Sequence, residues 1–288
     1  MQKTICFLRT HKINEAIISE FTKMQNCGVD CAIILDNTNN IVDDDKKERL
    51  KELEFYGVKA SCVLLYYEDY IKLGFYNFDN VAYNFWFNVD YAVYIAKSYF
   101  EGYDYYWSLE YDCFLNAPNY KDFFDFYKKD DADFIISHFR KESLNGSWWP
   151  SHDISWAYDE KENLHGCLFS NERYSARFLE HLYEKRKEFS NKFLKYNGKK
   201  AWLHPEVMSA TEAVKNGFKV RNYTDDGHYV NVPGGGYENI INGKKVILIP
   251  GDINLNENRL FLKPDNKMYH PIKDDNTKSR DERIKIFK

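Results

Sequence analysis

The sequence lacks any long apolar run. No stretch approaches the ~20 consecutive apolar residues that a membrane-spanning helix needs, and the chain enters its first apolar segment at Thr4 without a preceding leader. We therefore expect neither a transmembrane segment nor a secretory signal.

Excess charge of one sign is also absent. The chain has 40 Lys and Arg residues against 44 Asp and Glu residues, which gives a formal net charge of -4. Proteins that bind nucleic acid gather basic residues to neutralise phosphates. The balance of charges therefore argues against a nucleic-acid partner.

Cysteine is scarce and shows no pairing pattern. The sequence has 6 cysteines, none of them in a CxxC pair, and most lie within apolar runs. We interpret them as reduced core residues, because a disulfide framework or a zinc site needs cysteines at characteristic spacings. Reduced thiols indicate a cytoplasmic protein.

Several catalytic signatures are missing as well. The sequence contains no P-loop, no GxGxxG after the first expected strand, no HExxH and no GxSxG. These absences exclude the common signatures of nucleotide hydrolysis, dinucleotide binding, zinc proteases and serine hydrolases. The triple glycine at 234–236 is not followed by Lys-Ser or Lys-Thr, and we interpret it as a turn.

Aromatic side chains are abundant, with 23 Tyr, 21 Phe and 6 Trp. Most of them are expected to fill the core. The alternative is that some stack on a sugar ring or a base.

Apolar segments alternate with amphipathic ones, which is typical of strands joined by helical crossovers. The pattern predicts an α/β fold with an open, mostly parallel sheet flanked by helices. The expected strands are 4–8, 31–35, 60–66, 105–109, 133–137 and 245–249, and the expected helices are 15–24, 44–56, 89–100, 175–193 and 205–216. Segments 76–88 and 146–158 are expected to be loops.

Open parallel sheets bind ligands at the carboxyl ends of their strands. The expected strands place four polar turns at that edge: Arg9-Thr10-His11, Asp36-Asn37-Thr38, Glu110-Tyr111-Asp112 and His138-Phe139-Arg140. Residues two apart in an extended chain point to the same side, so both acids of the third turn can face one ion. Paired carboxylates suit Mg²⁺ or Mn²⁺, although strands also end in acidic residues where no metal binds.

The stretch 103–112, YDYYWSLEYD, resembles the strand and acidic motif of GT-A glycosyltransferases, in particular bacterial enzymes that build capsule or lipopolysaccharide glycans. The opening strand-helix-strand unit and segment 268–273, MYHPIK, extend this resemblance over most of the chain. It implies a GT-A, Rossmann-like fold. It also implies metal-assisted transfer of a sugar, with inversion, from a nucleoside diphosphate sugar such as a UDP-sugar to a glycan hydroxyl in surface polysaccharide synthesis.

The resemblance also implies roles for individual residues. Glu110, Asp112 and His270 would hold Mn²⁺ or Mg²⁺, and Lys273 would contact the donor diphosphate. Glu110, which stands where the family more often has Asp, would belong to the donor site as well. The remaining donor-binding residues would be Arg9, Thr10, Asp36 and Asn37.

An inverting transferase needs a base for the acceptor hydroxyl. The preferred candidate is Glu206, in the first turn of a helix that begins at Pro205, and the second candidate is Asp153. Trp148 and Trp149 are expected to stack on the acceptor sugar. The alternatives are that Glu206 is an acid at the start of a helix without a catalytic role, and that the two tryptophans belong to an aromatic loop without a binding role.

We expect one catalytic domain over 1–273, with a nucleotide-sugar half at 1–140, an acceptor half at 141–273, and a charged tail at 274–288. Basic residues in the tail could bring the protein to the inner membrane, where lipid-linked glycan acceptors lie, but interspersed acids favour a solvated tail. Two other functions stay open: a non-catalytic carbohydrate-binding protein of the same fold, and a metal-dependent phosphoesterase.

Overall fold

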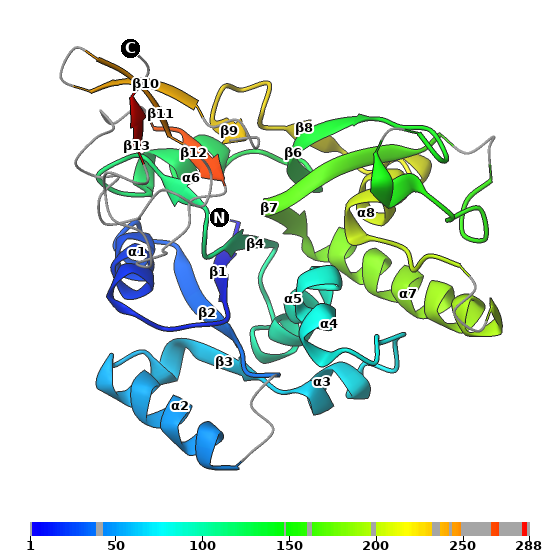
Figure 1. The fold of residues 1–288 in the computed structure, drawn as a ribbon, viewed down its shortest axis with the longest axis horizontal. Helices are drawn as coiled ribbons and strands as arrows, with labels where there is room; N and C mark the ends of the chain where they lie inside the picture. Colours follow the sequence, from blue (N-terminus) through cyan, green and yellow to red (C-terminus); the bar gives the residue numbers. More distant parts are fainter. Residues whose placement is uncertain are drawn as a thin grey trace.

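The computed structural model describes residues 2–38, 43–146, 148–159, 163–196, 200–231, 237–241, 244–248, 266–270 and 284–286. Over these residues, helices flank a seven-stranded sheet whose strand order is β3-β2-β1-β4-β7-β6-β8 (Figure 1). Its strands are β1 (Thr4–Thr10), β2 (Asp30–Asp36), β3 (Cys62–Leu65), β4 (Tyr105–Glu110), β6 (Phe134–Lys141), β7 (His165–Ser175) and β8 (Val220–Asn222).

The sheet is mostly parallel. β1 pairs in parallel with β2 and with β4, β2 with β3, and β6 with β8. β7 runs antiparallel to both of its neighbours, β4 and β6. The predicted α/β class, with an open, mostly parallel sheet flanked by helices, is confirmed.

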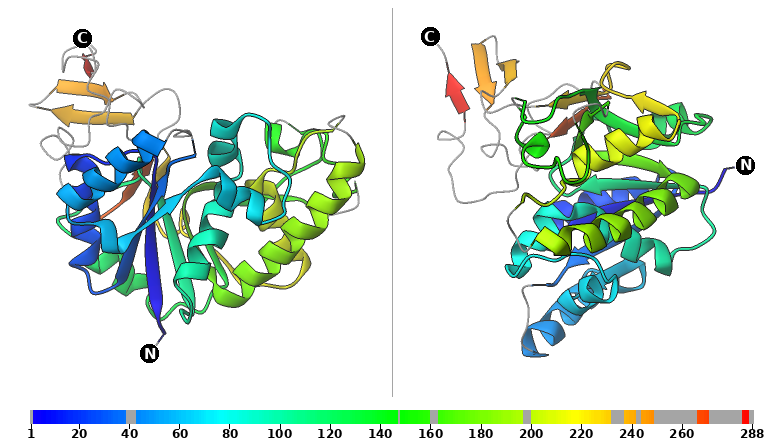
Figure 2. Two further views of the ribbon diagram at one scale, coloured as in Figure 1. Left: turned by 90° about the horizontal axis from the view of Figure 1, so that it is seen from below. Right: turned by 90° about the vertical axis from the view of Figure 1, so that its right-hand side faces the viewer.

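Helices cover both faces of the sheet, and Figures 1 and 2 show the two layers. Their bounds are α1 (Glu15–Gln25), α2 (Asp43–Phe55), α3 (Tyr67–Lys72), α4 (Val81–Phe87), α5 (Val89–Tyr99), α6 (Lys121–Tyr127), α7 (Ala176–Phe193) and α8 (Pro205–Lys215). Short 3₁₀ turns lie at η1 (Lys59–Ser61), η2 (Trp149–Ser151) and η3 (Leu194–Tyr196). One core lies under α5, α7 and α8, and the other lies under α1 and α6.

Local sequence explains why these helices form where they do. The Asn14 side chain accepts a hydrogen bond of 3.0 Å from the Ile17 amide and so caps the start of α1. Ile17, Phe21 and Met24 then recur at helical spacing and are completely buried. Ser175 caps α7 in the same way, through a 3.2 Å bond from the Phe178 amide.

Two small sheets adjoin the large one. β12 (Met268–His270) pairs with β5 (Phe114–Leu115) and with β9 (Tyr229–Asn231). β10 (Tyr237–Ile241), β11 (Lys244–Leu248) and β13 (Ile284–Ile286) form the other, which Figure 2 shows at the end of the molecule opposite the N-terminus. Within the expected tail at 274–288, only the β13 residues are described, and they pair with β11.

The structure differs from the sequence expectation in two places that matter for the site. The segment expected as a loop at 76–88 contains α4, capped by Asn80. β7 was not expected at all, because its middle residues Asn171, Glu172 and Arg173 are polar, yet all three are buried. It lies between β4 and β6 in the sheet.

In the described part of the chain, no helix has the length and apolar character that a membrane crossing requires. All six cysteines are free.

Candidate active site

The parallel register brings the ends of β1, β2 and β4 to one edge of the sheet. Arg9 of β1 pairs directly with Glu110 of β4, and Asp36 is the last residue of β2. The polar turns that follow these strands therefore meet at this edge, as ligand sites in such sheets do.

His270 reaches the same edge from the far end of the chain. β12 pairs antiparallel with β5, with Tyr269 opposite Phe114, and this register sets His270 beside the turn that follows β4. Its Nε2 lies 3.2 Å from Glu110 Oε2 and 3.5 Å from Asp112 Oδ1.

Glu110, Asp112 and His270 offer one ligand atom each, and these atoms all lie within 4.8 Å of one another. Two atoms bound at right angles around an ion at about 2.1 Å lie about 3 Å apart, close to the two distances from Nε2. Two carboxylates and an imidazole suit Mn²⁺, and the carboxylates suit Mg²⁺. The residues present therefore fit a divalent ion.

The charge of His270 depends on the same two acids. Burial acts to lower the pKa of this imidazole, but hydrogen bonds and attraction from Asp112 and Glu110 outweigh burial and raise the pKa to about 9. This raised pKa favours the imidazolium form at neutral pH, whose positive charge lies beside both carboxylates.

A second charged group lies directly behind these ligands. The buried Arg9 guanidinium makes a 3.1 Å ion pair with Glu172 Oε1 and lies 3.6 Å from Glu110 Oε1. Burial raises the pKa of Glu172 to about 7, against the opposing attraction of Arg9. Arg9 therefore compensates the acids at the edge of the sheet.

Glu206 lies on the other side of β4, where α8 begins. Pro205 occupies the first turn of α8, and the His204 side chain caps the helix by accepting a 3.4 Å bond from the Glu206 amide. The Glu206 carboxylate accepts a 2.9 Å hydrogen bond from the Phe169 amide of β7. Burial raises the pKa of Glu206 to about 8 and lowers that of His204 to about 3. The imidazole of His204 is therefore neutral.

These groups line one pocket of about 600 Å³. The metal-ligand group and Glu206 both face it, and aromatic side chains from α4 and η2 complete its wall. Its lining residues are Arg9, His11, Asp36, Phe85, Trp86, Val89, Glu110, Tyr111, Asp112, Trp148, Trp149, Leu168, Phe169, His204, Glu206 and His270. Carboxylates and aromatic faces in one concavity are a typical combination for a polar ligand with a ring.

Three of the expected site residues do not line this pocket. Thr10 is buried, and its hydroxyl bonds with the carbonyl and amide of Lys12 in the turn after β1. The Asn37 amide donates to the Leu65 carbonyl. Asp153 is exposed, and its amide bonds to the Asn145 side chain. Lys273 lies outside the described residues, as does the triple glycine at 234–236.

The two expected acceptor tryptophans differ in their surroundings. Trp148 is half-buried, with its ring against Gly166 and the Arg140 guanidinium 5.0 Å above the ring centre. Trp149 has half of its surface exposed.

Sequence reasoning missed Glu172, Trp86 and His204, and also the apolar lining residues Phe85, Val89, Leu168 and Phe169. Glu172 was missed with its strand, and Trp86 lies on a helix that was expected to be a loop. His204 had a usable signal, because a polar residue before a helix-starting Pro is a capping position.

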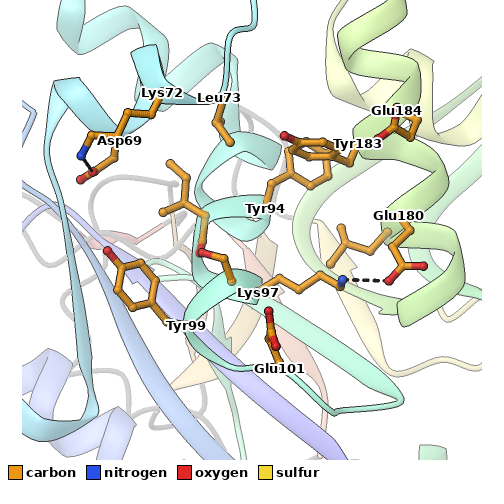
Figure 3. A pocket seen from close by; sticks show the side chains of 13 residues that line it. Asp69, Lys72, Leu73, Tyr94, Lys97, Tyr99, Glu101, Glu180, Tyr183 and Glu184 are labelled. Atoms are coloured by element: carbon orange, nitrogen blue, oxygen red, sulfur yellow. Dashed lines mark hydrogen bonds and ion pairs between the residues drawn. The ribbon is translucent and has the colours of Figure 1, made fainter.

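A different concavity, of about 690 Å³, lies between α3, α5 and α7 (Figure 3). Its lysines are engaged with acids, because Lys72 binds Asp69 and Lys97 binds Glu180, each at 3.0 Å. It contains no histidine, and its lining lacks the convergent carboxylates of the sheet edge. The chemistry that the sequence predicted is therefore in the other pocket.

No protein-family model and no curated protein matches this chain. Among solved structures, mouse xyloside xylosyltransferase 1 is similar at a TM-score of 0.46 and 7% identity, over 93% of this chain and 97% of that one. Core-mannan synthase A of Aspergillus fumigatus, in its Mn/GDP form, is similar at a TM-score of 0.43 and 14% identity. The match covers 78% of this chain and 73% of that one. The mannosyltransferase Ktr4p of S. cerevisiae is similar at a TM-score of 0.42 and 12% identity. The match covers 78% of this chain and 69% of that one.

Proposed function

We propose that this protein is a glycosyltransferase that moves a sugar from a nucleoside diphosphate sugar to a hydroxyl group of a glycan. One observation carries the proposal: Glu110, Asp112 and His270 converge at the carboxyl edge of a parallel sheet, in a pocket that also contains the buried carboxyl of Glu206. The first group serves a departing diphosphate and the second serves an attacking hydroxyl.

The order of the strands separates donor from acceptor. Along the edge, Asp36 of β2 and Arg9 of β1 precede Glu110 of β4, and Glu206 follows beside β7. We assign the nucleotide to the side of Asp36 and the acceptor to the side of Glu206.

Each side chain has a defined task in this scheme. Glu110, Asp112 and His270 would hold Mn²⁺ or Mg²⁺, which when bound supplies positive charge to the departing diphosphate. Glu206 accepts the proton of the acceptor hydroxyl, and a pKa of about 8 suits a base that works near neutral pH. The exposed Asp153 is the weaker candidate, because it does not line the pocket. Arg9 keeps the acids at the edge of the sheet compensated.

We also propose a donor, a stereochemistry, an acceptor and a cellular location, as the sequence predicts them. The donor is a UDP-sugar, the anomeric centre inverts, and Lys273 contacts the diphosphate. The acceptor is a glycan or lipid-linked glycan of a bacterial surface polysaccharide, and the enzyme works in the cytoplasm, at or near the inner membrane.

The direct test is release of the nucleoside diphosphate from UDP-, GDP- and TDP-sugars in the presence of Mn²⁺. We expect turnover with one nucleotide class, and loss of at least 100-fold in Asp112→Asn. His152→Asn is the matched control, because His152 is exposed and outside the pocket. Hydrolysis of simple phosphate esters without turnover of any nucleotide sugar would instead identify a phosphoesterase.

A further inference from the structure

Trp86 and Trp149 lie next to each other on the surface, although they are 63 positions apart in the sequence. Their ring centres are 6.4 Å apart, and the two ring planes differ by only 11°. Trp86 is 58% exposed and Trp149 is 50% exposed. The other four of the 6 tryptophans are buried or half-buried, so the exposed ones are gathered at one place.

The ring of Trp149 is held in place by its neighbours. Phe87 packs against it at 6.0 Å, and His204 meets it at 5.0 Å with the ring planes at 72°. Phe87 and His204 also contact each other at 4.7 Å. These contacts restrain the Trp149 ring, and a restrained side chain loses less entropy when a ligand binds.

Exposed apolar surface next to a polar cleft usually has a binding role. Both tryptophans line the pocket that contains Glu206, and Trp149 contacts His204, whose Nδ1 lies 3.5 Å from Glu206 Oε2. Both tryptophans therefore belong to the same pocket as Glu206, and His204 connects Trp149 to that carboxyl group.

We propose that Trp86 and Trp149 form one stacking subsite for a pyranose ring of the acceptor. This rests on the proposed function, in which the acceptor is a glycan, and it assigns the recognition of one sugar ring of that glycan to these two side chains. The C–H face of a pyranose packs on an indole face, while its hydroxyl groups remain free to reach water or Glu206.

The first experiment measures quenching of tryptophan fluorescence by acrylamide in the full-length protein. The probes are trisaccharides of α- and β-linked glucose, galactose, mannose and N-acetylglucosamine, with UDP and GDP as the competing ligand class. We expect at least one trisaccharide to reduce quenching, and Trp86→Ala to remove most of that protection. Phe55→Ala is the matched control, because Phe55 is 82% exposed and lies on α2, outside the pocket, and it should keep the protection.

The second experiment uses steady-state kinetics with an accepted glycan. Trp86→Ala should raise the KM for the acceptor about tenfold, with kcat and the KM for the donor changed by less than about twofold. A rise in the donor KM alone, or protection of the tryptophans by nucleotides and by no trisaccharide, would overturn the proposal and mark the pair as a base-stacking site.

The experiments distinguish a missing stacking subsite from a missing glycosyltransferase activity. Protection by a trisaccharide without turnover of any nucleotide sugar rejects the glycosyltransferase and keeps the carbohydrate site. Turnover of a nucleotide sugar with no protection by any trisaccharide rejects the stacking subsite and keeps the enzyme.

Discussion

Replacement of Glu206 by Gln should make the protein more stable than the wild type at alkaline pH and less active there. The folded-state pKa of Glu206 is raised from 4.5 to about 8 because the carboxyl group is buried. A carboxyl whose pKa is higher in the folded state binds a proton more tightly there, so stability falls as pH rises from 4.5 through 8.

The size of the effect follows from the shift. One pKa unit corresponds to about 1.36 kcal/mol, so between pH 5 and pH 8 the wild-type protein should lose about 3 to 4 kcal/mol through this group. Gln does not ionise, and its carbonyl oxygen can still accept the hydrogen bond from the Phe169 amide. The stability of Glu206→Gln relative to the wild type should therefore increase by about 3 kcal/mol over this range.

Urea denaturation without metal, at several pH values between 5 and 8.5, measures this difference. Glu212→Gln is the matched control on the same helix, because the Glu212 carboxylate is held by Tyr158, His181 and Asn216 and its loss should destabilise the protein throughout. A Glu206→Gln difference that is the same at pH 5 and pH 8.5 would refute the reasoning. In the activity assay, wild-type kcat/KM should rise about tenfold per pH unit below about pH 8, and the variant should lose 100-fold or more.

Other predictions concern the neighbours of this group. Because the pKa of His270 is raised to about 9, binding of Mn²⁺ should displace about one proton from the protein between pH 6 and 8, and the affinity for Mn²⁺ should rise about tenfold per pH unit. Calorimetry in buffers of different ionisation enthalpy measures the number of protons released. If no proton is released, His270 is not a metal ligand. The fully buried Arg186 side chain donates hydrogen bonds to Asp90 at 2.6 Å and to the Leu203 carbonyl at 2.5 Å. It thereby holds the segment before α8 in place. Arg186→Leu should cost about 3 to 5 kcal/mol in urea denaturation, because Asp90 is left as a buried, unpaired charge, and a loss below 1 kcal/mol would contradict this.

Local patterns were sufficient to predict most of the sheet edge. The apolar runs before Arg9, Asp36 and Glu110 predicted parallel strands, and the register then places their ends together. The start of α8 at Pro205 was also predicted, since proline at the first turn is a local signal.

Long-range pairing was beyond local patterns. Glu172 of β7 is buried in an ion pair with Arg9, which lies on a strand far away in the sequence. The pairing of β12 with β5 brings His270 to Asp112 across more than half of the chain, and only the resemblance of segment 268–273 to glycosyltransferases suggested it. Trp86 and Trp149 likewise meet through tertiary packing, which no spacing in the sequence encodes.

The central claim is that Glu110, Asp112 and His270 form a metal-dependent site for a nucleoside diphosphate. Thermal unfolding with UDP or GDP, with Mn²⁺ or with EDTA, tests it most directly, because a ligand at 100 times its Kd stabilises the folded state by about 2.7 kcal/mol. We predict a rise of several degrees in Tm for one nucleotide, only with Mn²⁺, and none in Asp112→Asn. An equal rise in EDTA, or an equal rise in Asp112→Asn, would contradict the account.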